Sequence, residues 1–495
     1  MNAINKFLLK RYYIWIGLVL LLTTLIRLPS HFEPLWYDDE AITLTVGQQL
    51  NHGKILYRDI IDHKTPILYW LAASLPSIKM FKIGASVIVL GITIAFGLLV
   101  GRLMLNIRYG GIYAFGALLL FAVLFNLPTI EGNLVNGEIV MTLFSLWGWV
   151  VVWHFVKSKR IGYLLIAGLM FGLSIMVKIP SGVEVIVCLL VLGYIANVSE
   201  KYGKYKQMSY NFLLVLSGFL LPILMISLWF IWRGAFFEFI KIAGLFNLGY
   251  IEAWKENVPV AQTQIMPWGV ILRLLLAIAS SIYIWFEKTD VKNKFARWWF
   301  VWSLFGALLS GRPYPHYLIQ IIAPSILLIW MSWNLKVRQM IITIILLLGL
   351  WVTQYIFMFW RYPTIAYYEN FINWYQNKQD NAEYYNNFDP NTWSQYQVTN
   401  YIKANPKTNN KFWIYSDKPD IYALTNASLL TKNITAYHIQ DFGRVSETME
   451  ALVLNSPSLI VWGPVGIKTE EIETWIKQNY HEEISFEQFG IWRKN

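Results

Sequence analysis

Three acidic residues stand side by side in the stretch "WYDDEA", which spans residues 36–41. They are Asp38, Asp39 and Glu40. A positioned carboxylate can take a proton from a hydroxyl group as a general base, which contributes roughly 100- to 10,000-fold to a rate. The same acids open a predicted helix, "DDEAITLTVGQQL", where they can instead cap the first turn and complement the helix dipole. Neighbouring helical residues point in different directions, so we expect Asp38 to cap the helix while another acid faces a cavity.

Three further stretches gather charged or hydrogen-bonding residues, and the first two of them contain acids. They contain Arg58, Asp59, Asp62, His63 and Lys64; then Glu131, Asn133, Asn136 and Glu138; and then Arg312, Tyr314, His316 and Tyr317.

Each of these stretches also has a structural explanation. Lys64 can extend along the membrane surface toward lipid headgroups, and Glu138 can be a first-turn acid that complements a helix dipole. His316 has no second histidine or acid at ligand spacing, which favours a hydrogen-bonded histidine over a metal ligand. Lys178 and Glu184 flank the turn "KIPSGVE" and are explained most simply as a helix end.

The composition places these residues in a membrane protein. The chain has 495 residues, of which 56% are hydrophobic and only 14% charged, and its mean hydropathy is +0.42. Its net charge of +11 comes from short clusters between apolar runs, as topology signals do, so we expect no nucleic-acid partner. The one cysteine, Cys188, lies in an apolar run and excludes an internal disulfide framework.

A spanning helix needs about 20 apolar residues, which predicts about eleven spans. They lie near residues 12–28, 84–105, 109–128, 139–157, 161–178, 180–196, 210–231, 266–286, 297–310, 316–333 and 338–359. Basic clusters fall in alternate loops, which predicts a cytoplasmic N-terminus and an extracytoplasmic C-terminal region. Residues 66–82 are predicted as a helix along the outer surface, because counting them as a span would invert every later loop.

The chain is therefore predicted to have two domains. Residues 1–360 form the transmembrane domain, with 29–83 as one long external loop that carries interfacial helices. Residues 361–495 form a small extracytoplasmic α/β domain, with helices near 365–378, 391–404, 445–454 and 468–479. Its strands are "KFWIYS" and "SLIVWG".

Several motifs carry a resemblance to a known family. They are "WYDDEA", "LYRDIIDHKTPILYWLAA", "NLVNGEIVMTLF", "GRPYPHYLIQIIAPSILL" and, more weakly, "GLSIMVKIPSG". Together they resemble the GT-C superfamily of lipid-dependent glycosyltransferases. The closest likeness is to the branch of the dolichyl-phosphate-mannose protein mannosyltransferases and their bacterial relatives, the aminoarabinose transferases that act on lipid A. Two departures are that Lys64-Thr65-Pro66 stands where the family has Lys-Pro-Pro, and that Asp38 precedes the usual acidic pair.

The resemblance implies a polytopic helical GT-C fold and an inverting transfer of a sugar from a polyprenyl-phosphate donor to an acceptor on the extracytoplasmic side. Asp39 is the expected base, and Glu40 is expected to support it. Glu138 is expected to position a hydroxyl group. The expected donor-phosphate and substrate contacts are Arg58, His63, Lys64, Arg312, His316 and Tyr317.

Other questions stay open at the level of sequence. The constellation requires no metal, although paired acids are compatible with a divalent cation. The expected partners are membrane lipids, the lipid-linked donor and an acceptor that is a protein, a lipid or a polysaccharide, in a plasma membrane. The alternative function is a polytopic transporter of a lipid-linked or small polar substrate, which would place its binding groups near mid-bilayer and show repeated halves.

Overall fold

The computed structural model describes residues 3–106, 109–198, 204–247, 268–310, 314–332, 363–405 and 411–495, with Arg312 and a few separate positions between 340 and 352. The chain divides into two compact units. The first contains Met1–Leu28, Ala85–Leu228 and Met266–Thr364, and the second contains Pro29–Gly84, Trp229–Ile265 and Ile365–Asn495. Residues 29–84 therefore group with the C-terminal region.

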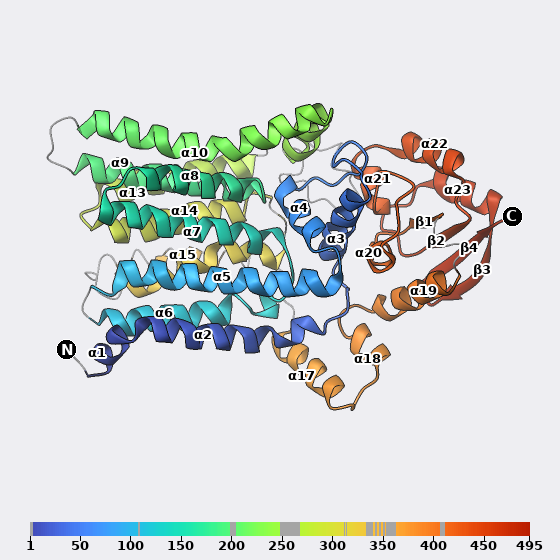
Figure 1. Cartoon of the computed structure of the whole chain (residues 1–495), viewed down its shortest axis with the longest axis horizontal. Helices are drawn as coiled ribbons and strands as arrows, with labels where there is room; N and C mark the ends of the chain where they lie inside the picture. Colours follow the sequence, from blue (N-terminus) through green and yellow to red (C-terminus); the bar gives the residue numbers. More distant parts are fainter. Residues whose placement is uncertain are drawn as a thin grey trace. The chain divides into compact units, whose positions relative to one another are not determined.

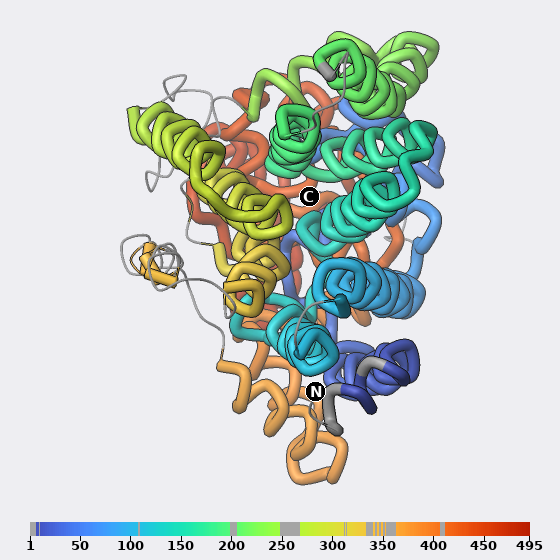
Figure 2. Tube along the Cα trace, turned by 90° about the vertical axis from the view of Figure 1, so that its left-hand side faces the viewer, coloured from blue at the N-terminus to red at the C-terminus, as the bar shows by residue number. Residues whose placement is uncertain are grey.

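The first unit is a bundle of apolar helices, which Figure 2 views nearly along their axes. Its helices are α1 (Ala3–Lys10), α2 (Tyr12–Arg27), α5 (Ile78–Met104, which begins in the second unit), α6 (Gly110–Leu124), α7 (Gly137–Ser158), α8 (Gly162–Ile175), α9 (Val183–Asn197), α10 (Lys204–Trp232, which ends in the second unit), α13 (Trp268–Phe286), α14 (Val291–Ala307) and α15 (Ile319–Ser332). The short turns η2 (Pro128–Ile130), η3 (Ile179–Gly182) and η6 (Pro315–Leu318) precede α7, α9 and α15.

Seven helices of the described residues are long and apolar enough to cross a membrane, and α6 and α8 are shorter apolar helices. The protein is thus a multi-pass membrane protein. The predicted span 338–359 lies almost wholly outside the described residues, as do parts of the basic clusters near Lys201 and Lys336.

Small residues let two of these helices approach closely. A Cβ atom on Gly168 of α8 would lie 2.1 Å from the carbonyl oxygen of Val215 in α10, and one on Gly218 of α10 would lie 2.1 Å from that of Leu165. Such backbone contacts are typical of helix packing in lipid, where dispersion and close approach replace the hydrophobic driving force.

The second unit combines helices with a four-stranded sheet (Figure 1). Its helices are α3 (Asp38–Asn51), α4 (Pro66–Ser74), α11 (Phe236–Phe239), α17 (Thr364–Tyr375, from its second residue), α18 (Asn381–Asn386), α19 (Thr392–Ala404), α20 (Asp420–Thr425), α21 (Ala436–Asp441), α22 (Val445–Asn455) and α23 (Glu470–Asn479), with the turn η1 (Leu28–His31) and a π-helical turn at Ile240–Leu245. Its strands are β1 (Phe412–Tyr415), β2 (Leu459–Trp462), β3 (Tyr480–Phe486) and β4 (Phe489–Lys494).

The sheet has the order β1-β2-β4-β3, with β1 parallel to β2 and the other pairs antiparallel. Trp413 and Tyr415 of β1 belong to a hydrophobic core with residues of α21, α22 and α23. Phe412 faces the other way and stacks on Tyr422 of α20 at 5.7 Å between ring centroids. This two-sided burial confirms the predicted α/β character, and the β3–β4 hairpin was not foreseen.

The predicted helix over 66–82 is wrong, because α4 ends at Ser74 and residues 78–82 belong to α5. Pro76 explains the break, since proline lacks a backbone N–H and disfavours helical geometry at the residue before it. Ser77 then accepts a hydrogen bond from the Met80 backbone amide at 3.2 Å and starts α5.

Candidate active site

The first turn of α3 carries the three consecutive acids. Tyr37, in an extended conformation, is the N-cap residue and makes no side-chain cap bond. The prediction that Asp38 caps this helix is therefore wrong: the helix starts one residue earlier than the capping pattern requires, and Asp38 is its first helical residue.

The three acids bind three different lysines. Asp38 Oδ1 lies 3.3 Å from Lys418 Nζ, Asp39 Oδ1 lies 2.8 Å from Lys64 Nζ, and Glu40 Oε2 lies 2.9 Å from Lys82 Nζ. Consecutive helical side chains are about 100° apart around the axis, which sends each carboxylate to a different neighbour. The three acids are thus adjacent in the sequence but have different surroundings and different partners.

Asp38 belongs to an acidic group around Lys418. Lys418 Nζ also lies 3.1 Å from Asp389 Oδ2, and the carboxyl group of Asp420 is buried nearby. Burial raises the pKa of Asp38 to about 6, despite the opposing charge of Lys418. The contact with Lys418, which Asp39 does not share, sets these two neighbouring acids apart.

Glu40 lies in a buried ion cluster rather than at an open surface. Lys82 Nζ contacts Glu40 and also Glu33 Oε2, at 3.3 Å, and all three residues are at most 5% exposed. Tyr367 donates its hydroxyl to the second oxygen of Glu33. The cluster joins α3, the start of α5 and α17, which makes it an anchor for the first turn of α3.

We expect Lys82→Met to destabilise the protein strongly. Removing the cation takes the compensating charge away from two buried carboxylates, and breaking a buried ion pair costs about 3–5 kcal/mol. Thermal unfolding of the detergent-solubilised protein, followed by tryptophan fluorescence, measures the loss. Lys79→Met is the matched control, because Lys79 is exposed on the same helix; equal melting temperatures for the two variants would contradict an anchoring role.

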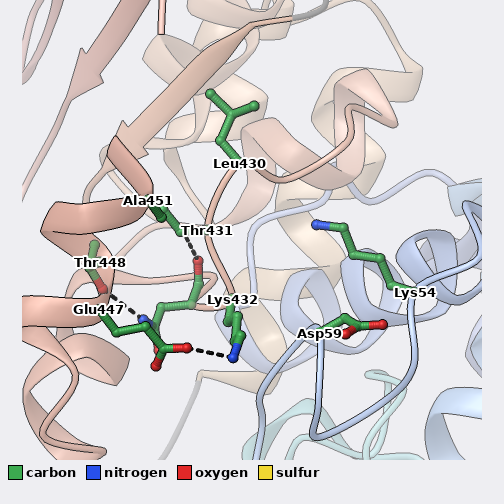
Figure 3. A pocket seen from close by; sticks show the side chains of 9 residues that line it. Lys54, Asp59, Leu430, Thr431, Lys432, Glu447, Thr448 and Ala451 are labelled. Carbon is green, nitrogen blue, oxygen red and sulfur yellow. Dashed lines mark hydrogen bonds and ion pairs between the residues drawn. The ribbon is translucent and has the colours of Figure 1, made fainter. Parts of the chain in front are cut away.

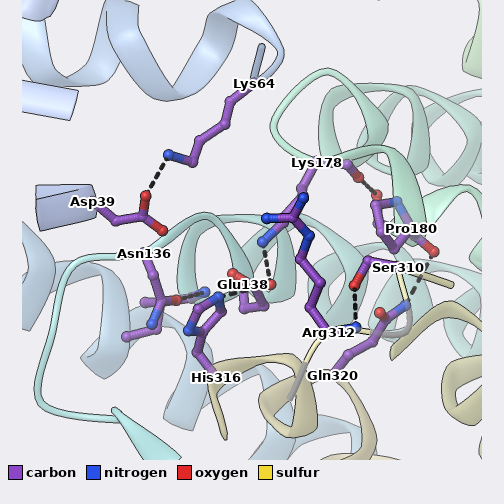
Figure 4. A network of polar contacts seen from close by, with 12 residues as sticks. Asp39, Lys64, Asn136, Glu138, Lys178, Pro180, Ser310, Arg312, His316 and Gln320 are labelled. Atoms are coloured by element: carbon purple, nitrogen blue, oxygen red, sulfur yellow. Dashed lines mark hydrogen bonds and ion pairs between the residues drawn. The ribbon is translucent and has the colours of Figure 1, made fainter. Parts of the chain in front are cut away.

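The partner of Asp39, Lys64, lies in the segment before α4 (Figure 4). Lys64 Nζ is also 3.5 Å from Asp62 Oδ2. Tyr57, held at a left-handed φ of 69°, donates its hydroxyl to the Lys64 carbonyl at 2.7 Å and so fixes the segment. The Lys64 side chain is only 10% exposed, and its ammonium bridges two carboxylates. This arrangement is unlike that of a lysine that extends freely toward headgroups.

Asp62 holds His63 beside this lysine. Its Oδ1 atom accepts a hydrogen bond from the His63 backbone amide at 2.6 Å and lies 3.0 Å from His63 Nδ1. Burial alone would raise the pKa of Asp62, but Lys64 and His63 together hold it well below its ordinary value. Asp62 therefore remains a carboxylate and orients both Lys64 and His63.

Arg58 binds the aspartate that follows it in the sequence. Its guanidinium makes two bonds of 2.8 Å to the adjacent Asp59 and donates to the Arg233 carbonyl at 3.3 Å. Asp59 thus already occupies the edge of the Arg58 guanidinium that could otherwise bind a phosphate through two hydrogen bonds.

His438 of α21 is a residue that the sequence did not single out. It is 2% exposed, and burial lowers its pKa to about 4 although Asp62 acts in the opposite direction. Its Nδ1 atom has no hydrogen-bond partner among the described residues. A lone histidine 374 positions after Lys64 carries no local signal, because only the fold brings it within electrostatic reach of Asp62 and Lys64.

The first unit holds a second polar group, at the start of α7. Glu138 forms an ion pair with Lys178, and His316 Nδ1 contacts Glu131. His316 Nε2 is 3.9 Å from Glu138 Oε1, and Lys178 Nζ lies 4.7 Å from the centre of the Tyr317 ring. Figure 4 shows the Arg312 side chain pointing toward this group.

Backbone geometry and caps position these residues. Asn136 caps α7 by accepting a hydrogen bond from the Ile139 amide at 3.1 Å, and Glu131 adopts a left-handed φ of 60°. Arg27, buried at the end of α2, donates to Asn126 Oδ1 at 3.3 Å and to the Asn133 carbonyl at 3.1 Å. Arg27 thus fixes the loop before α7.

Lys178 and Glu184 both flank the predicted turn, but a helix end does not account for their contacts. Lys178 pairs with Glu138, and Glu184, fully enclosed in α9, accepts a hydrogen bond from Trp149 Nε1 at 2.6 Å. The weak "GLSIMVKIPSG" motif was the signal that could have assigned Lys178 to the site.

The residues predicted for the site thus form two groups, one in each unit. Asp39, His63 and Lys64 lie together with Asp62 in the second unit, and Glu138, His316 and Tyr317 lie together with Lys178 in the first. Among the described residues, no three His, Cys, Asp or Glu side chains are arranged to hold a metal ion. Both groups instead pair acids with fixed cations, which suits proton transfer and anion binding.

Comparison with known proteins identifies the fold. No protein-family model matches the sequence, and no curated protein matches it. The chain is similar to the crystal structure of ArnT from Cupriavidus metallidurans bound to undecaprenyl phosphate, with a TM-score of 0.55, 11% sequence identity and 97% of each chain covered. The chain therefore has an ArnT-like fold, and the expected polytopic helical architecture with a small C-terminal α/β part is confirmed.

Proposed function

We propose that this chain is an integral-membrane glycosyltransferase whose donor is a sugar linked to a polyprenyl phosphate. The Asp39–Lys64 ion pair carries the proposal, because a proton acceptor and a cation suited to phosphate lie 2.8 Å apart, with the Lys64 side chain 10% exposed and the Asp39 side chain 33% exposed. The ArnT-like fold supports the class of donor, since that structure holds undecaprenyl phosphate.

In the proposed reaction, the donor phosphate replaces Asp39 as the partner of Lys64. Asp39, released from the ion pair, takes the proton of the acceptor hydroxyl. The acceptor oxygen forms its bond to the anomeric carbon while the bond from that carbon to the phosphate oxygen breaks. Attack from the opposite face inverts the anomeric configuration, and the polyprenyl phosphate leaves with the bonding electron pair.

A second acid is not required for the leaving group. A phosphate monoester leaves as an anion, and charge-assisted hydrogen bonds to it are roughly twice as strong as neutral ones. Lys64 is the first candidate for this contact, with His63 beside it. Arg58 is a weaker candidate than its position in the sequence suggested, since the phosphate would have to compete with Asp59.

The group at the start of α7 is suited to binding hydroxyl or phosphate groups. Glu138 Oε2 is buried without a hydrogen-bond partner among the described residues, so it can accept a bond from a sugar or acceptor hydroxyl. Lys178, His316, Tyr317 and Arg312 supply donors around it. Glu40 is assigned the task of anchoring α3, because Lys82 and the surrounding protein enclose it completely.

Mass spectrometry of lipids that copurify with the protein tests the proposal directly. We expect a polyprenyl phosphate or its sugar-linked form to be bound, and the labelled form of that lipid to lose its sugar to an acceptor in the presence of enzyme. Asp39→Asn should retain the lipid and lose the transfer. Purified protein that neither retains nor binds any polyprenyl phosphate would refute the proposal.

A further inference from the structure

A pocket of about 220 Å³ lies within the second unit, apart from the Asp39–Lys64 pair (Figure 3). Its lining is mostly charged or hydrogen-bonding and includes Lys54, Asp59, Lys432, Asn433, Glu447 and Thr448. At about 30 Å³ per water molecule, the space suits a ligand of the size of one sugar ring rather than a lipid chain.

Two chain segments far apart in sequence build the pocket. Lys54 follows α3 and donates from Nζ to the Leu429 carbonyl at 2.6 Å. The Ile61 amide donates to the Lys432 carbonyl at 3.0 Å. These bonds fix the two walls against each other, so the pocket is preformed.

The charges around the pocket do not balance. Arg58 neutralises Asp59, and both Lys432 and Arg444 contact the single carboxylate of Glu447. No carboxylate of the described residues lies within 4.0 Å of Lys54 Nζ. The lining itself is balanced, with Lys54 and Lys432 against Asp59 and Glu447. Arg58 and Arg444, which bind these two carboxylates from outside the lining, leave a net positive charge around the pocket, and this favours an anionic ligand.

Lys54 is held in an environment that disfavours its own charge. Burial lowers the pKa of Lys54 to about 8, although Asp59 opposes the shift. A bound anion would supply the missing counter-charge and favour the ammonium form. Nothing in the proposed transfer reaction uses this residue.

Asn433 offers a complementary acceptor. Its Nδ2 atom donates to Thr448 Oγ1 at 3.0 Å, while its Oδ1 atom is buried with no hydrogen-bond partner in the described part of the chain. A buried carbonyl oxygen without a partner costs free energy unless a ligand or water donates to it. A ligand hydroxyl is the natural donor.

We propose that this pocket binds an anionic monosaccharide-sized group, with its phosphate or carboxylate on Lys54 and Lys432 and a hydroxyl on Asn433. This assignment does not depend on the transfer reaction. The anion can belong to a soluble sugar derivative or to a lipid headgroup, which share the same chemistry.

Isothermal titration calorimetry on the full chain in phosphatidylcholine nanodiscs tests the assignment. Glucose 6-phosphate and glucuronate are expected to bind, and uncharged glucose at least tenfold more weakly. Lys54→Met should weaken glucose 6-phosphate at least tenfold, because a charge-assisted bond is lost, while Lys54→Arg should retain most of the affinity. Lys403→Met, at an exposed position of α19, is the matched control and should bind like wild type.

The pH dependence gives an independent check. The ammonium form of Lys54 binds the anion. The affinity for glucuronate, whose carboxylate stays ionised above about pH 5, should therefore be constant from there to about pH 8 and fall as the pH rises further. The other charged residues that line the pocket are Asp59, Lys432 and Glu447. Arg58 contacts Asp59 from beside the pocket. In Lys54→Arg the decline above pH 8 should disappear, because arginine keeps its charge there.

Three outcomes decide the proposal. Equal glucose 6-phosphate affinity in wild type and Lys54→Met, or no binding at all, would overturn it. If Lys54→Met lowers the melting temperature, Asn433→Ala and Lys432→Met carry the test, and unchanged affinity in both would overturn it as well. Adding phosphatidylglycerol to the nanodiscs distinguishes the two sources of the anion. If this lipid competes with glucose 6-phosphate in the wild type but not in Lys54→Met, the anion belongs to a lipid headgroup. If the lipid does not compete, the anion belongs to a soluble sugar.

Discussion

Asp39→Asn is expected to lower the turnover of sugar transfer by roughly 100- to 10,000-fold, the range for loss of a general base. Asparagine keeps the size of the side chain and can still accept a bond from Lys64, so the fold should persist. The affinity for the donor should be unchanged or higher, because Lys64 no longer holds a carboxylate. Single-turnover transfer from a radiolabelled polyprenyl-phosphate sugar measures the step.

Asp38→Asn is the comparison variant for this experiment. Asp38 lies in the same helical turn but binds Lys418, so its amide variant leaves the Asp39–Lys64 ion pair in place. We expect a much smaller loss of turnover. Near-normal turnover of Asp39→Asn with a large loss in Asp38→Asn would move the base to Asp38.

Lys64→Met is expected to weaken donor binding about 10- to 150-fold, which corresponds to the loss of one charge-assisted hydrogen bond of about 1.5–3 kcal/mol. The variant also leaves Asp39 and Asp62 without their shared cation, which adds repulsion against an incoming phosphate. Titration of the protein with undecaprenyl phosphate, followed by native mass spectrometry, measures the affinity.

Two further variants interpret that result. Lys64→Arg should restore part of the affinity, because it keeps the charge with a different geometry. Lys79→Met removes an exposed lysine from the nearby helix α5 and should bind the donor normally. An unchanged affinity in Lys64→Met would mean that Lys64 serves only as a structural cation between Asp39 and Asp62.

Much of the membrane region could be predicted because its signals are local. Apolar runs, basic clusters and the acids beside them lie in short stretches, and the helices α7, α9 and α13 begin within a few residues of the predicted spans. The break at Pro76 was missed although its signal is equally local, since proline disfavours helical geometry at the residue before it.

The partners of the site residues could not be predicted. Lys418 lies 380 positions from Asp38, and Lys82 lies 42 positions from Glu40. Periodicity fixes which face a side chain occupies on its own helix, but the residue that meets it depends on the tertiary fold. The sequence therefore indicated which groups could do chemistry, and the structure assigned Glu40 and Asp38 to different lysines.

The glutamines of α3 have a consequence for how the protein is made. Gln48 donates to the Ala423 carbonyl and Gln49 to the Ala427 carbonyl, at 3.0 and 2.8 Å, across 375 and 378 positions of sequence. At about 5–20 residues per second, the ribosome needs roughly 20 to 75 s to supply these partners after α3 has emerged. During synthesis, α3 therefore lacks these two hydrogen bonds until the last quarter of the chain has been made.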